Sequence, residues 1–177
     1  NIPVVGDLKE VFSELNKFED QFDFTDWVNR LNTYKMTREG LRESTDLYVD
    51  PKEFVYLLTQ GIKDESVIVT DVGQNQIYAC SNFVSKGACF VTSGGFGCMG
   101  FSLPAAIGAK IGNKNKRIIS LNGDGAFQMS MAELSTLKQE NLDIKIVIFN
   151  NKALGMIKEY QHLKYNNNYT FNELNGF

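Results

Sequence analysis

Short apolar runs separated by polar loops dominate the second half of the chain. Residues 67–70, 118–121 and 144–149 have the length and the β-branched content of buried strands. The stretch between the last two runs has helical character, begins at a capping box over residues 130–133 and ends near Asn141. This pattern predicts a β-α-β crossover, in which the two strands run parallel.

Two more helices are expected around this crossover. Asp50 can cap a helix that has Pro51 at its first position and ends at Gly61. Pro104 begins a helix of small residues that runs to residue 111. Repeated strand and helix units of this kind predict an α/β fold, with a doubly wound parallel sheet and helices on both faces.

Residues 1–46 have a different pattern. A strand-like start precedes a helix, and Trp27, Leu31 and Tyr34 follow at helical spacing, which predicts a small satellite core. We expect this part to be an N-terminal helical appendage, made of the tail of a preceding domain and a linker. Residues 47–177 are expected to form the main, ligand-binding domain, truncated at its C-terminal end.

Polar residues follow two of the predicted strands: Gly123-Asp124-Gly125 after the second and Asn150-Asn151 after the third. Because ligands of open α/β sheets bind at the carboxyl ends of the strands, Asp124 and Asn151 are expected to face one ligand. Their oxygens suit Mg²⁺ or Ca²⁺, and they are too few for an all-protein cage, which favours a phosphorylated ligand that completes the metal's coordination. Gly123 and Gly125 are expected to adopt positive φ and to turn backbone amides toward the phosphate. An ordinary polar turn and loop would have the same composition.

These residues resemble a known motif. Gly123-Asp124-Gly125, followed after 24 residues by Asn150-Asn151, is similar to the thiamine diphosphate motif of thiamine-dependent decarboxylases and carboligases. Three further segments, residues 71–76, 93–100 and 154–157, resemble the last domain of the acetolactate synthase family in order and spacing. The resemblance implies a magnesium- and thiamine diphosphate-binding domain of a transferase of branched-chain amino acid biosynthesis. Such an enzyme decarboxylates pyruvate and joins the product to a second 2-keto acid, with the cofactor as electron sink.

The resemblance also implies a ligand set for the diphosphate end of the cofactor. Asp124, the side chain of Asn151 and the backbone carbonyl of Ala153 would hold Mg²⁺, and diphosphate oxygens and a water would complete an octahedron. Gly125 and Ala126 would offer backbone N–H groups to the diphosphate.

The remaining cofactor contacts are assigned in the same way. Gln74 and Asn75 would reach the phosphates from the other side, although acetolactate synthases often have His at the second position. The main chain of Gly97 and Met99 would pair with the aminopyrimidine ring, and the Met99 side chain would keep the cofactor bent. Met99 would equally suit an ordinary apolar core.

Substrate and assembly are implied less directly. Met156 is assigned to the substrate pocket, and Tyr160 lies where the family has a tryptophan that selects the second keto acid; both residues would also fit a plain core or surface role. No catalytic residue is expected in this chain, because the activating glutamate of the family comes from another domain and from a partner subunit. The chain alone is therefore expected to be inactive. The parent enzyme would be a homodimer or a higher homo-oligomer, and the resemblance leaves open whether it binds FAD.

Three other interpretations stay open. The chain could belong to another thiamine diphosphate-dependent decarboxylase or carboligase, or it could be a noncatalytic binding module with the same fold. Residues 95–100 also form a literal G-x-G-x-x-G after a strand-like segment at residues 90–92, with Asp124 downstream as the acid that would bind a ribose. That arrangement is typical of nicotinamide oxidoreductases, which makes them the third alternative.

Composition narrows the possible partners. The 177-residue chain has a net charge of −3 and no cluster of Lys or Arg, so we expect neither nucleic acid nor an anionic membrane as a partner. Its three cysteines form no C-x-x-C pair, and the sequence has no signal peptide or long apolar span, which indicates a reducing, cytoplasmic setting. The single histidine, His162, lies among polar residues and is interpreted as solvated.

Overall fold

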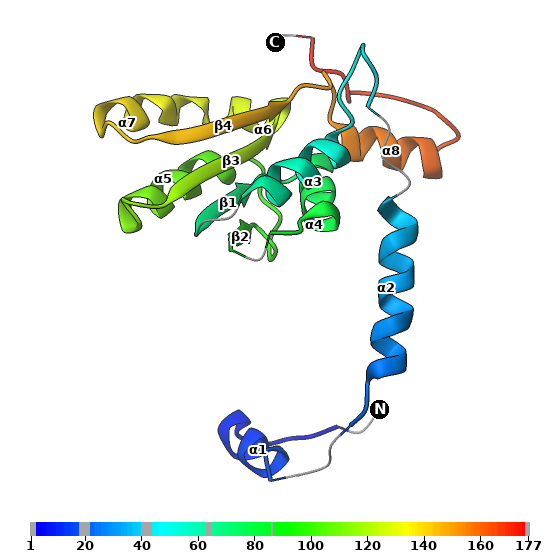
Figure 1. Ribbon diagram of the computed structural model, residues 1–177. Helices are drawn as coiled ribbons and strands as arrows, with labels where there is room; N and C mark the ends of the chain where they lie inside the picture. The colour runs from blue at the N-terminus through cyan, green and yellow to red at the C-terminus, as the bar shows by residue number, and fades with distance from the viewer. Residues whose placement is uncertain (1–2, 18–21, 40–43, 63–64, 86, 176–177) are drawn as a thin grey trace. The chain divides into compact units, whose positions relative to one another are not determined.

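The computed structural model describes residues 3–17, 22–39, 44–62, 65–85 and 87–175 (Figure 1). The chain divides into two compact units, Asn1–Leu41 and Arg42–Phe177. The division lies five residues before the boundary expected from the sequence at residue 46, and the assignment of the first part as the tail of a preceding domain stays a prediction.

The second unit is built on a four-stranded parallel sheet. The strands are β1 (Ser66–Thr70), β2 (Cys89–Thr92), β3 (Arg117–Gly123) and β4 (Ile144–Phe149), in the order β2-β1-β3-β4. Both neighbours of β1 pair with it in parallel, and β4 pairs in parallel with β3. The predicted parallel α/β sheet is confirmed.

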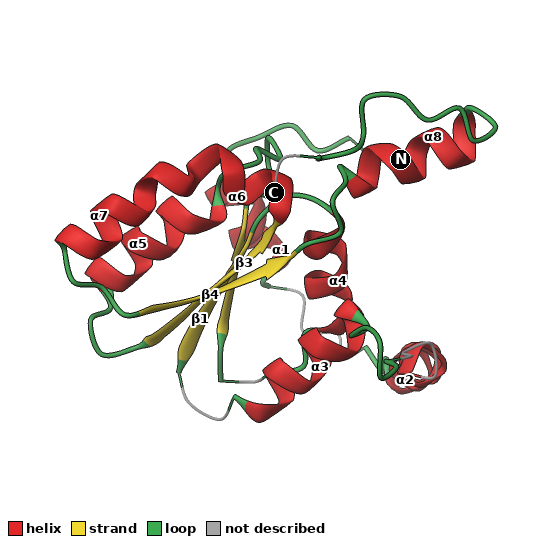
Figure 2. Cartoon of the chain, turned by 90° about the horizontal axis from the view of Figure 1, so that it is seen from above, coloured by secondary structure: helices red, strands yellow, loops and turns green. Residues whose placement is uncertain are grey.

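Helices cover both faces of this sheet (Figure 2). On one side α3 (Pro51–Gly61) and α4 (Gln74–Asn82) contribute Val55 and Ala79, which pack against Ile68 of β1. All five residues of β1 are buried, because a strand covered on both faces has no solvent side.

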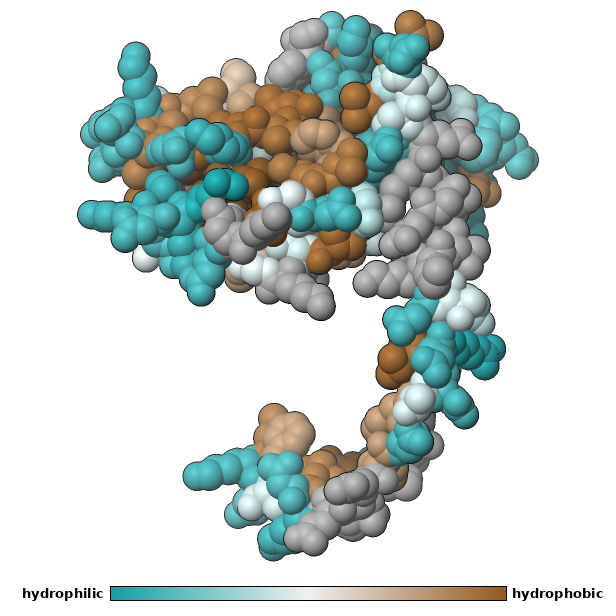
Figure 3. Space-filling model, viewed as in Figure 1, coloured by the Kyte–Doolittle hydropathy of each residue, from teal (hydrophilic) through white to brown (hydrophobic). Residues whose placement is uncertain are grey.

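The opposite face is covered by helices that follow β2 and β3. α5 (Ser102–Gly112) places Ala106 against Val67, Val69 and Ile118. The other elements of this layer are α6 (Asp124–Ser130), η1 (Met131–Glu133) and α7 (Leu134–Gln139), and α8 (Gly155–Lys164) follows β4. Apolar surface gathers over β4, one of the two edge strands of the sheet (Figure 3).

The helix between β3 and β4 begins earlier than the sequence predicts. α6 starts at Asp124, directly after the strand, so Ser130 lies at the end of a helical turn and its hydroxyl caps nothing. The capping box was therefore a wrong prediction, because the backbone was already helical where the cap was expected. The predicted end is confirmed: Asn141 adopts φ 50°, and Leu142 N–H donates to the Leu137 carbonyl at 3.0 Å.

The first unit contains α1 (Leu8–Leu15) and α2 (Thr25–Glu39). Its described residues before α1 form no strand, in contrast to the strand-like start expected from the sequence. The predicted satellite core is also absent from the described part of this unit, since Trp27, Leu31 and Tyr34 are all exposed. Helical spacing alone does not bury a face when no second element packs against it. Among the described residues, no helix is long and apolar enough to cross a membrane.

Candidate functional site

The loops that leave the carboxyl ends of the strands surround a cavity of about 490 Å³. This end of the sheet is the one from which β4 continues toward α8 (Figure 1). The cavity walls come from the start of α4, the loop after β2, the start of α6 and the segment after β4. The predicted residues that line it are Gln74, Asn75, Gly97, Met99, Gly123, Ala126, Asn151, Ala153 and Met156. The fold thus brings together side chains that are more than seventy positions apart in the sequence, as expected for the crevice of an open parallel sheet.

Asp124 lies behind this wall and is almost fully buried, with 2% of its surface exposed. Its Oδ1 accepts a hydrogen bond from Gly125 N–H at 2.9 Å, whereas its Oδ2 is buried and has no partner among the described residues. A buried acceptor without a partner costs about 1–3 kcal/mol. A bound cation at this position would satisfy that oxygen, so the carboxylate fits a metal ligand.

The segment after β4 reaches the same end of the sheet. Gly123 and Phe149 are paired in the β3–β4 register, so Asp124 and Asn150 are the first residues beyond two neighbouring strands. No group of three or more His, Cys, Asp or Glu suitable for a metal occurs in the described part of the chain. A cation here would therefore depend on amide, carbonyl and ligand oxygens besides Asp124, which is the donor set of Mg²⁺ bound with a phosphorylated molecule.

Gly123 and Gly125 do not have the conformation expected for them. Gly123 has φ −81°, and Gly125 lies inside the first turn of α6; the positive-φ glycines are Gly73, Gly97 and Gly100. The reason for glycine at these two positions is close packing. A Cβ on Gly125 would lie 3.0 Å from Leu174 Cδ1 and 3.1 Å from Leu154 Cδ2, and one on Gly123 would lie 3.2 Å from Asn75 Oδ1.

Gln74 and Asn151 contact each other across the mouth of the site. Asn151 Nδ2 donates to Gln74 Oε1 at 3.4 Å, and Gln74 Nε2 donates to Glu159 Oε2 on α8 at 3.2 Å. Asn151 Oδ1 accepts from Ala153 N–H at 3.1 Å. Glycine at position 155 makes room for this arrangement, because a Cβ there would lie 2.0 Å from Gln74 Oε1 and would displace the end of that side chain.

Asn75 is buried, and its amide is directed back to the protein. Its Nδ2 donates to the Asp71 carbonyl at 2.8 Å and, more weakly, to Thr70 Oγ1 at 3.4 Å. Its Oδ1 faces the two glycines on either side, Gly73 and Gly123. Asn75 therefore braces the β1 and β3 ends of the site in this structure, while its predicted contact with phosphate stays a prediction.

Sequence reasoning assigned no role to Asp71, which is fully buried at the end of β1. Its Oδ1 accepts from Val72 N–H at 2.8 Å and from Gly100 N–H at 3.0 Å, and its Oδ2 accepts from Ser102 N–H at 2.7 Å. Burial raises the pKa of the Asp71 carboxyl, and the backbone N–H groups, with that of Ser102 foremost, oppose the rise. The available signal was an acid placed directly after an apolar strand.

Tyr78 was also missed, since nothing in the sequence marks it. It lines the cavity from α4, and burial, followed by the negative charges of Glu159 and Asp50, raises the pKa of its hydroxyl.

The predicted substrate residues lie apart from each other. Met156 lines the cavity, whereas Tyr160 is 54% exposed, packs edge-on against Tyr165 with ring centroids 5.9 Å apart, and lines neither described cavity. The second cavity, of about 340 Å³, lies beside the first and includes His162 and Tyr169. His162 is exposed, as expected, and its Nδ1 lies 3.2 Å from the Tyr169 hydroxyl.

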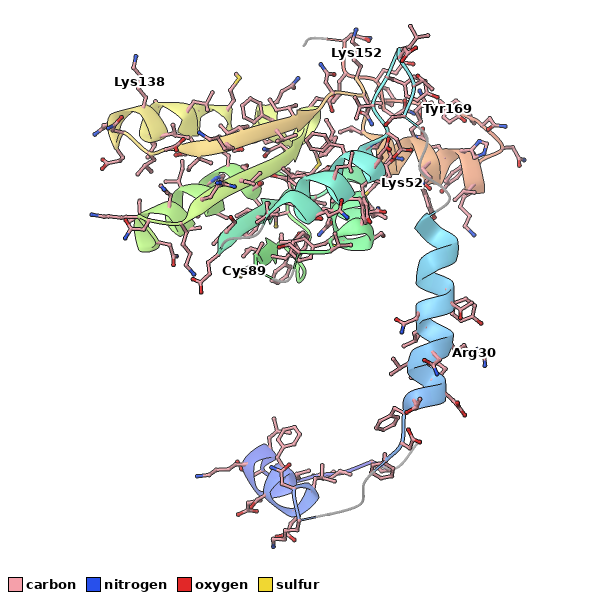
Figure 4. The ribbon with its side chains drawn as sticks, viewed as in Figure 1. Arg30, Lys52, Cys89, Lys138, Lys152 and Tyr169 are labelled. Carbon is pink, nitrogen blue, oxygen red and sulfur yellow. The ribbon has the colours of Figure 1, made fainter. Side chains whose placement is uncertain are left out.

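Figure 4 shows the distribution of several labelled side chains over the second unit. Lys152 and Tyr169 lie toward the end of the sheet that carries the cavities, whereas Lys138 lies on α7 at the other end. Positive charge near this end of the sheet therefore comes from Lys152 in the segment after β4, from Lys52 at the start of α3 and from Lys158, which lines the second cavity.

The geometry does not support the dinucleotide alternative. The G-x-G-x-x-G segment does follow β2 and precede α5, but β1 lies between β2 and β3 in the sheet, so Asp124 does not end the neighbouring strand. In the dinucleotide fold, the ribose acid follows the strand next to the glycine-rich turn. A Cβ on Gly95 or Gly97 would also meet nothing within 4 Å, so the first two glycines of this segment are not required by close packing; only Gly100, the third, is closely packed, with a Cβ there 3.2 Å from Met129 Cβ.

Fold and site together define an open parallel α/β domain with a polar ligand site at its strand ends. Residues 71–176 match the family described as thiamine pyrophosphate enzyme, C-terminal TPP binding domain, and the chain belongs to this family. It is a thiamine diphosphate-binding domain, and the family assignment made from its motifs is confirmed.

Its relatives include acetolactate synthase large subunits. The chain is 38% identical over 169 residues to that of Lactococcus lactis subsp. lactis, covering 93% of this chain and 29% of the relative. It is 34% identical over 183 residues to a probable acetolactate synthase large subunit of Methanococcus aeolicus, covering 93% of this chain and 31% of the relative. The chain thus spans less than a third of the length of either relative.

A solved structure with the same fold is the thiamine diphosphate-dependent 4-hydroxybenzoylformate decarboxylase of Rhodococcus jostii RHA1. The TM-score is 0.68 at 23% sequence identity, with 77% of this chain and 26% of that chain covered. This likeness confirms the fold.

Proposed function

We propose that this domain binds thiamine diphosphate through Mg²⁺, with Asp124, the Asn151 side chain and the Ala153 carbonyl as protein ligands. The observation that carries the proposal is the buried Asp124 Oδ2 without a partner, beside a cavity that Asn151 and Ala153 line. The net charge of −3 offers no general attraction for a diphosphate, so local neutralisation by a metal is needed.

The other residues would position the cofactor around this anchor. Gly125 and Ala126 lie in the first turn of α6 and would present backbone N–H groups to the diphosphate, that of Gly125 in exchange for its hydrogen bond to Asp124 Oδ1. Gln74 and Asn75 would close the opposite side. Gly97 and Met99 would hold the aminopyrimidine ring from the loop after β2. The bound cofactor supplies the electron sink for decarboxylation of a 2-keto acid.

Titration calorimetry of the chain with thiamine diphosphate tests the proposal. We expect binding in the presence of Mg²⁺, loss of binding after addition of a chelator, and recovery when Mg²⁺ is restored. Equal affinity with and without the chelator would overturn the metal bridge. Substitution of Asp124 should weaken the binding of thiamine diphosphate, and Asn151→Ala should weaken it as well, because both side chains are proposed to hold the metal.

For the complete protein, we propose an acetolactate synthase-like activity: condensation of two 2-keto acids, the first being pyruvate, with release of carbon dioxide. The support is identity of 34–38% with acetolactate synthase large subunits over most of this chain. We further propose that the parent is a homo-oligomer and that the glutamate that activates the cofactor lies outside this domain. The isolated chain should therefore bind cofactor without consuming pyruvate.

The product formed by the complete protein distinguishes the alternatives. Acetolactate from pyruvate supports the proposal, an aldehyde as the main product indicates another thiamine-dependent decarboxylase, and cofactor binding with no turnover indicates a noncatalytic module. Absorbance of the purified complete protein in the flavin region decides whether it also carries FAD.

A further inference from the structure

We propose that Asp71 is a positioning residue, which fixes the loop after β2 and thereby sets the affinity for the thiamine half of the cofactor separately from the diphosphate half. This inference rests on the proposed function. The loop concerned comprises residues 93–101 and carries Gly97 and Met99.

The contacts of Asp71 reach far along the chain. One carboxylate accepts N–H groups from Gly100 and Ser102, which are 29 and 31 positions away, at 3.0 and 2.7 Å. Hydrogen bonds to a charged group contribute more to stability than those between neutral groups. Both of these bonds are shielded from water because Asp71 is fully buried. The acid therefore ties the end of the loop to the end of β1, the centre of the ligand edge.

The other restraints on the loop are packing at its anchored end, where Phe101 contacts the core cluster that contains Val67 and Ala106, and a few local contacts before that end. Within the described residues, two other hydrogen bonds of its main chain are local, from Gly94 N–H to the Thr92 carbonyl at 2.9 Å and from Cys98 N–H to Ser93 Oγ at 3.1 Å. Phe96 is fully exposed. The orientation of the loop therefore depends on its anchored end, where Gly100 adopts φ 82°.

The two halves of the site have separate supports. The metal ligands and the backbone N–H groups proposed for the diphosphate lie on α6 and on the segment after β4, and Asp124 makes its hydrogen bond within α6. Asn75, which is proposed to reach the phosphates from α4, is held by the backbone carbonyl of Asp71 at 2.8 Å and not by its carboxylate. Met99 belongs to the anchored loop, where its Cε lies 3.5 Å from the position of a Cβ on Gly125. Loss of the Asp71 carboxylate should therefore release the pyrimidine end of the site while the diphosphate end stays in place.

Two probes separate the halves: thiamine diphosphate and inorganic pyrophosphate, each titrated with Mg²⁺ into the full chain. Asp71→Asn keeps the shape of the side chain and replaces one acceptor oxygen by a donor. We expect its affinity for thiamine diphosphate to fall about tenfold or more, as for the loss of a charge-assisted hydrogen bond. Its affinity for pyrophosphate should stay within about twofold of the wild type. A general loss of structure would weaken the binding of both probes together.

A second variant perturbs the same loop end from the other side of the contact. Gly100→Ala introduces a side chain at positive φ and places a Cβ 3.2 Å from Met129 Cβ, in the last turn of α6 and five residues after Asp124. Because the strain falls on the loop end and away from the start of α6, this variant should show the same selective loss even if Asp71→Asn fails to fold. Gly94→Ala is the matched control, because a Cβ there meets nothing within 4 Å, and it should leave both affinities unchanged.

The outcomes are distinct. Selective weakening of thiamine diphosphate in both variants supports the role of Asp71. An unchanged ratio of the two affinities in both variants overturns that role while leaving the metal site intact. If the wild-type chain binds neither probe with Mg²⁺, the proposed function itself is wrong.

Discussion

Replacing Asp124 by asparagine should change the stability of the domain in opposite directions with and without cofactor. In the structure, Asp124 Oδ1 accepts from Gly125 N–H, and Oδ2 is buried without a partner among the described residues. Asparagine has the same shape, keeps the first acceptor and carries no charge. We therefore expect the unliganded variant to be as stable as the wild type or more stable, by up to about 2 kcal/mol, because a buried unsatisfied charged group is the more costly one.

The cofactor should reverse this order. A ligand at 100 times its Kd stabilises the folded state by about 2.7 kcal/mol, which for a chain of this size is roughly 5–10 °C in Tm. Wild-type protein should gain this increment with thiamine diphosphate and Mg²⁺, and Asp124→Asn should gain little or none. Thermal unfolding followed by circular dichroism, with and without the ligand pair, measures both effects.

Asp143→Asn is a matched control for the same chemical change. Asp143 is exposed, lies before β4 at the opposite end of the strand, and pairs with Lys145 Nζ at 2.7 Å. It should keep the full ligand-dependent gain. The reasoning is refuted if Asp124→Asn retains that gain, or if the unliganded variant is destabilised by more than about 1 kcal/mol, which would mean that the carboxylate has a structural partner.

Three further predictions concern other parts of the site. Gly155→Ala should displace the flexible end of Gln74 and weaken cofactor binding about tenfold by calorimetry, with Tm nearly unchanged. Gly112→Ala is the control, because a Cβ there meets nothing within 4 Å and the affinity should stay intact. Equal affinities of Gly155→Ala and the wild type would contradict a role of Gln74 in cofactor binding. Because burial raises the pKa of Asp71, its contribution to stability is present below the ordinary value of 3.8 and is lost as pH rises through the raised pKa. The free energy of unfolding of the wild type minus that of Asp71→Asn, measured by urea titration, should therefore fall as pH rises from about 3.8 through the raised pKa. A difference that rises with pH would contradict a raised pKa for Asp71. In the complete enzyme, Tyr160→Trp should increase the preference for 2-ketobutyrate over pyruvate as second substrate, by the 1–3 kcal/mol at most that a small change in an apolar pocket contributes, about 200-fold or less; an unchanged product ratio removes Tyr160 from substrate selection.

Local signals in the sequence were sufficient to predict most of the sheet and its ligand edge. β4 has the predicted bounds, and the helix capped by Asp50 begins and ends where expected, because apolar runs and caps act over a few residues. The carboxyl-end rule then placed the segments around Asp124 and Asn151 at one edge without any knowledge of side-chain contacts.

What the sequence did not predict depends on contacts between distant residues. The glycine at position 125 is required by Leu154 and Leu174, far along the chain, rather than by its own backbone angles. Asp71 acquires its role from amides 29 and 31 positions away. Local propensity carries no information on such pairs, and the same limit explains why the helical spacing around Trp27 was misinterpreted as a core.

The order of the strands has a consequence for how the domain folds. β1 lies between β2 and β3, and the residues proposed to hold the cofactor are contributed by segments that follow all four strands. Because the site needs the segments after all four strands, it can form only after β4 has paired with β3. Pairing of strands that are distant in the sequence is slow compared with formation of a helix or a hairpin, so the site forms late in folding. Addition of the cofactor should therefore leave the rate of refolding unchanged and lower the rate of unfolding instead. The bound cofactor would prolong the lifetime of the folded domain without helping it to form.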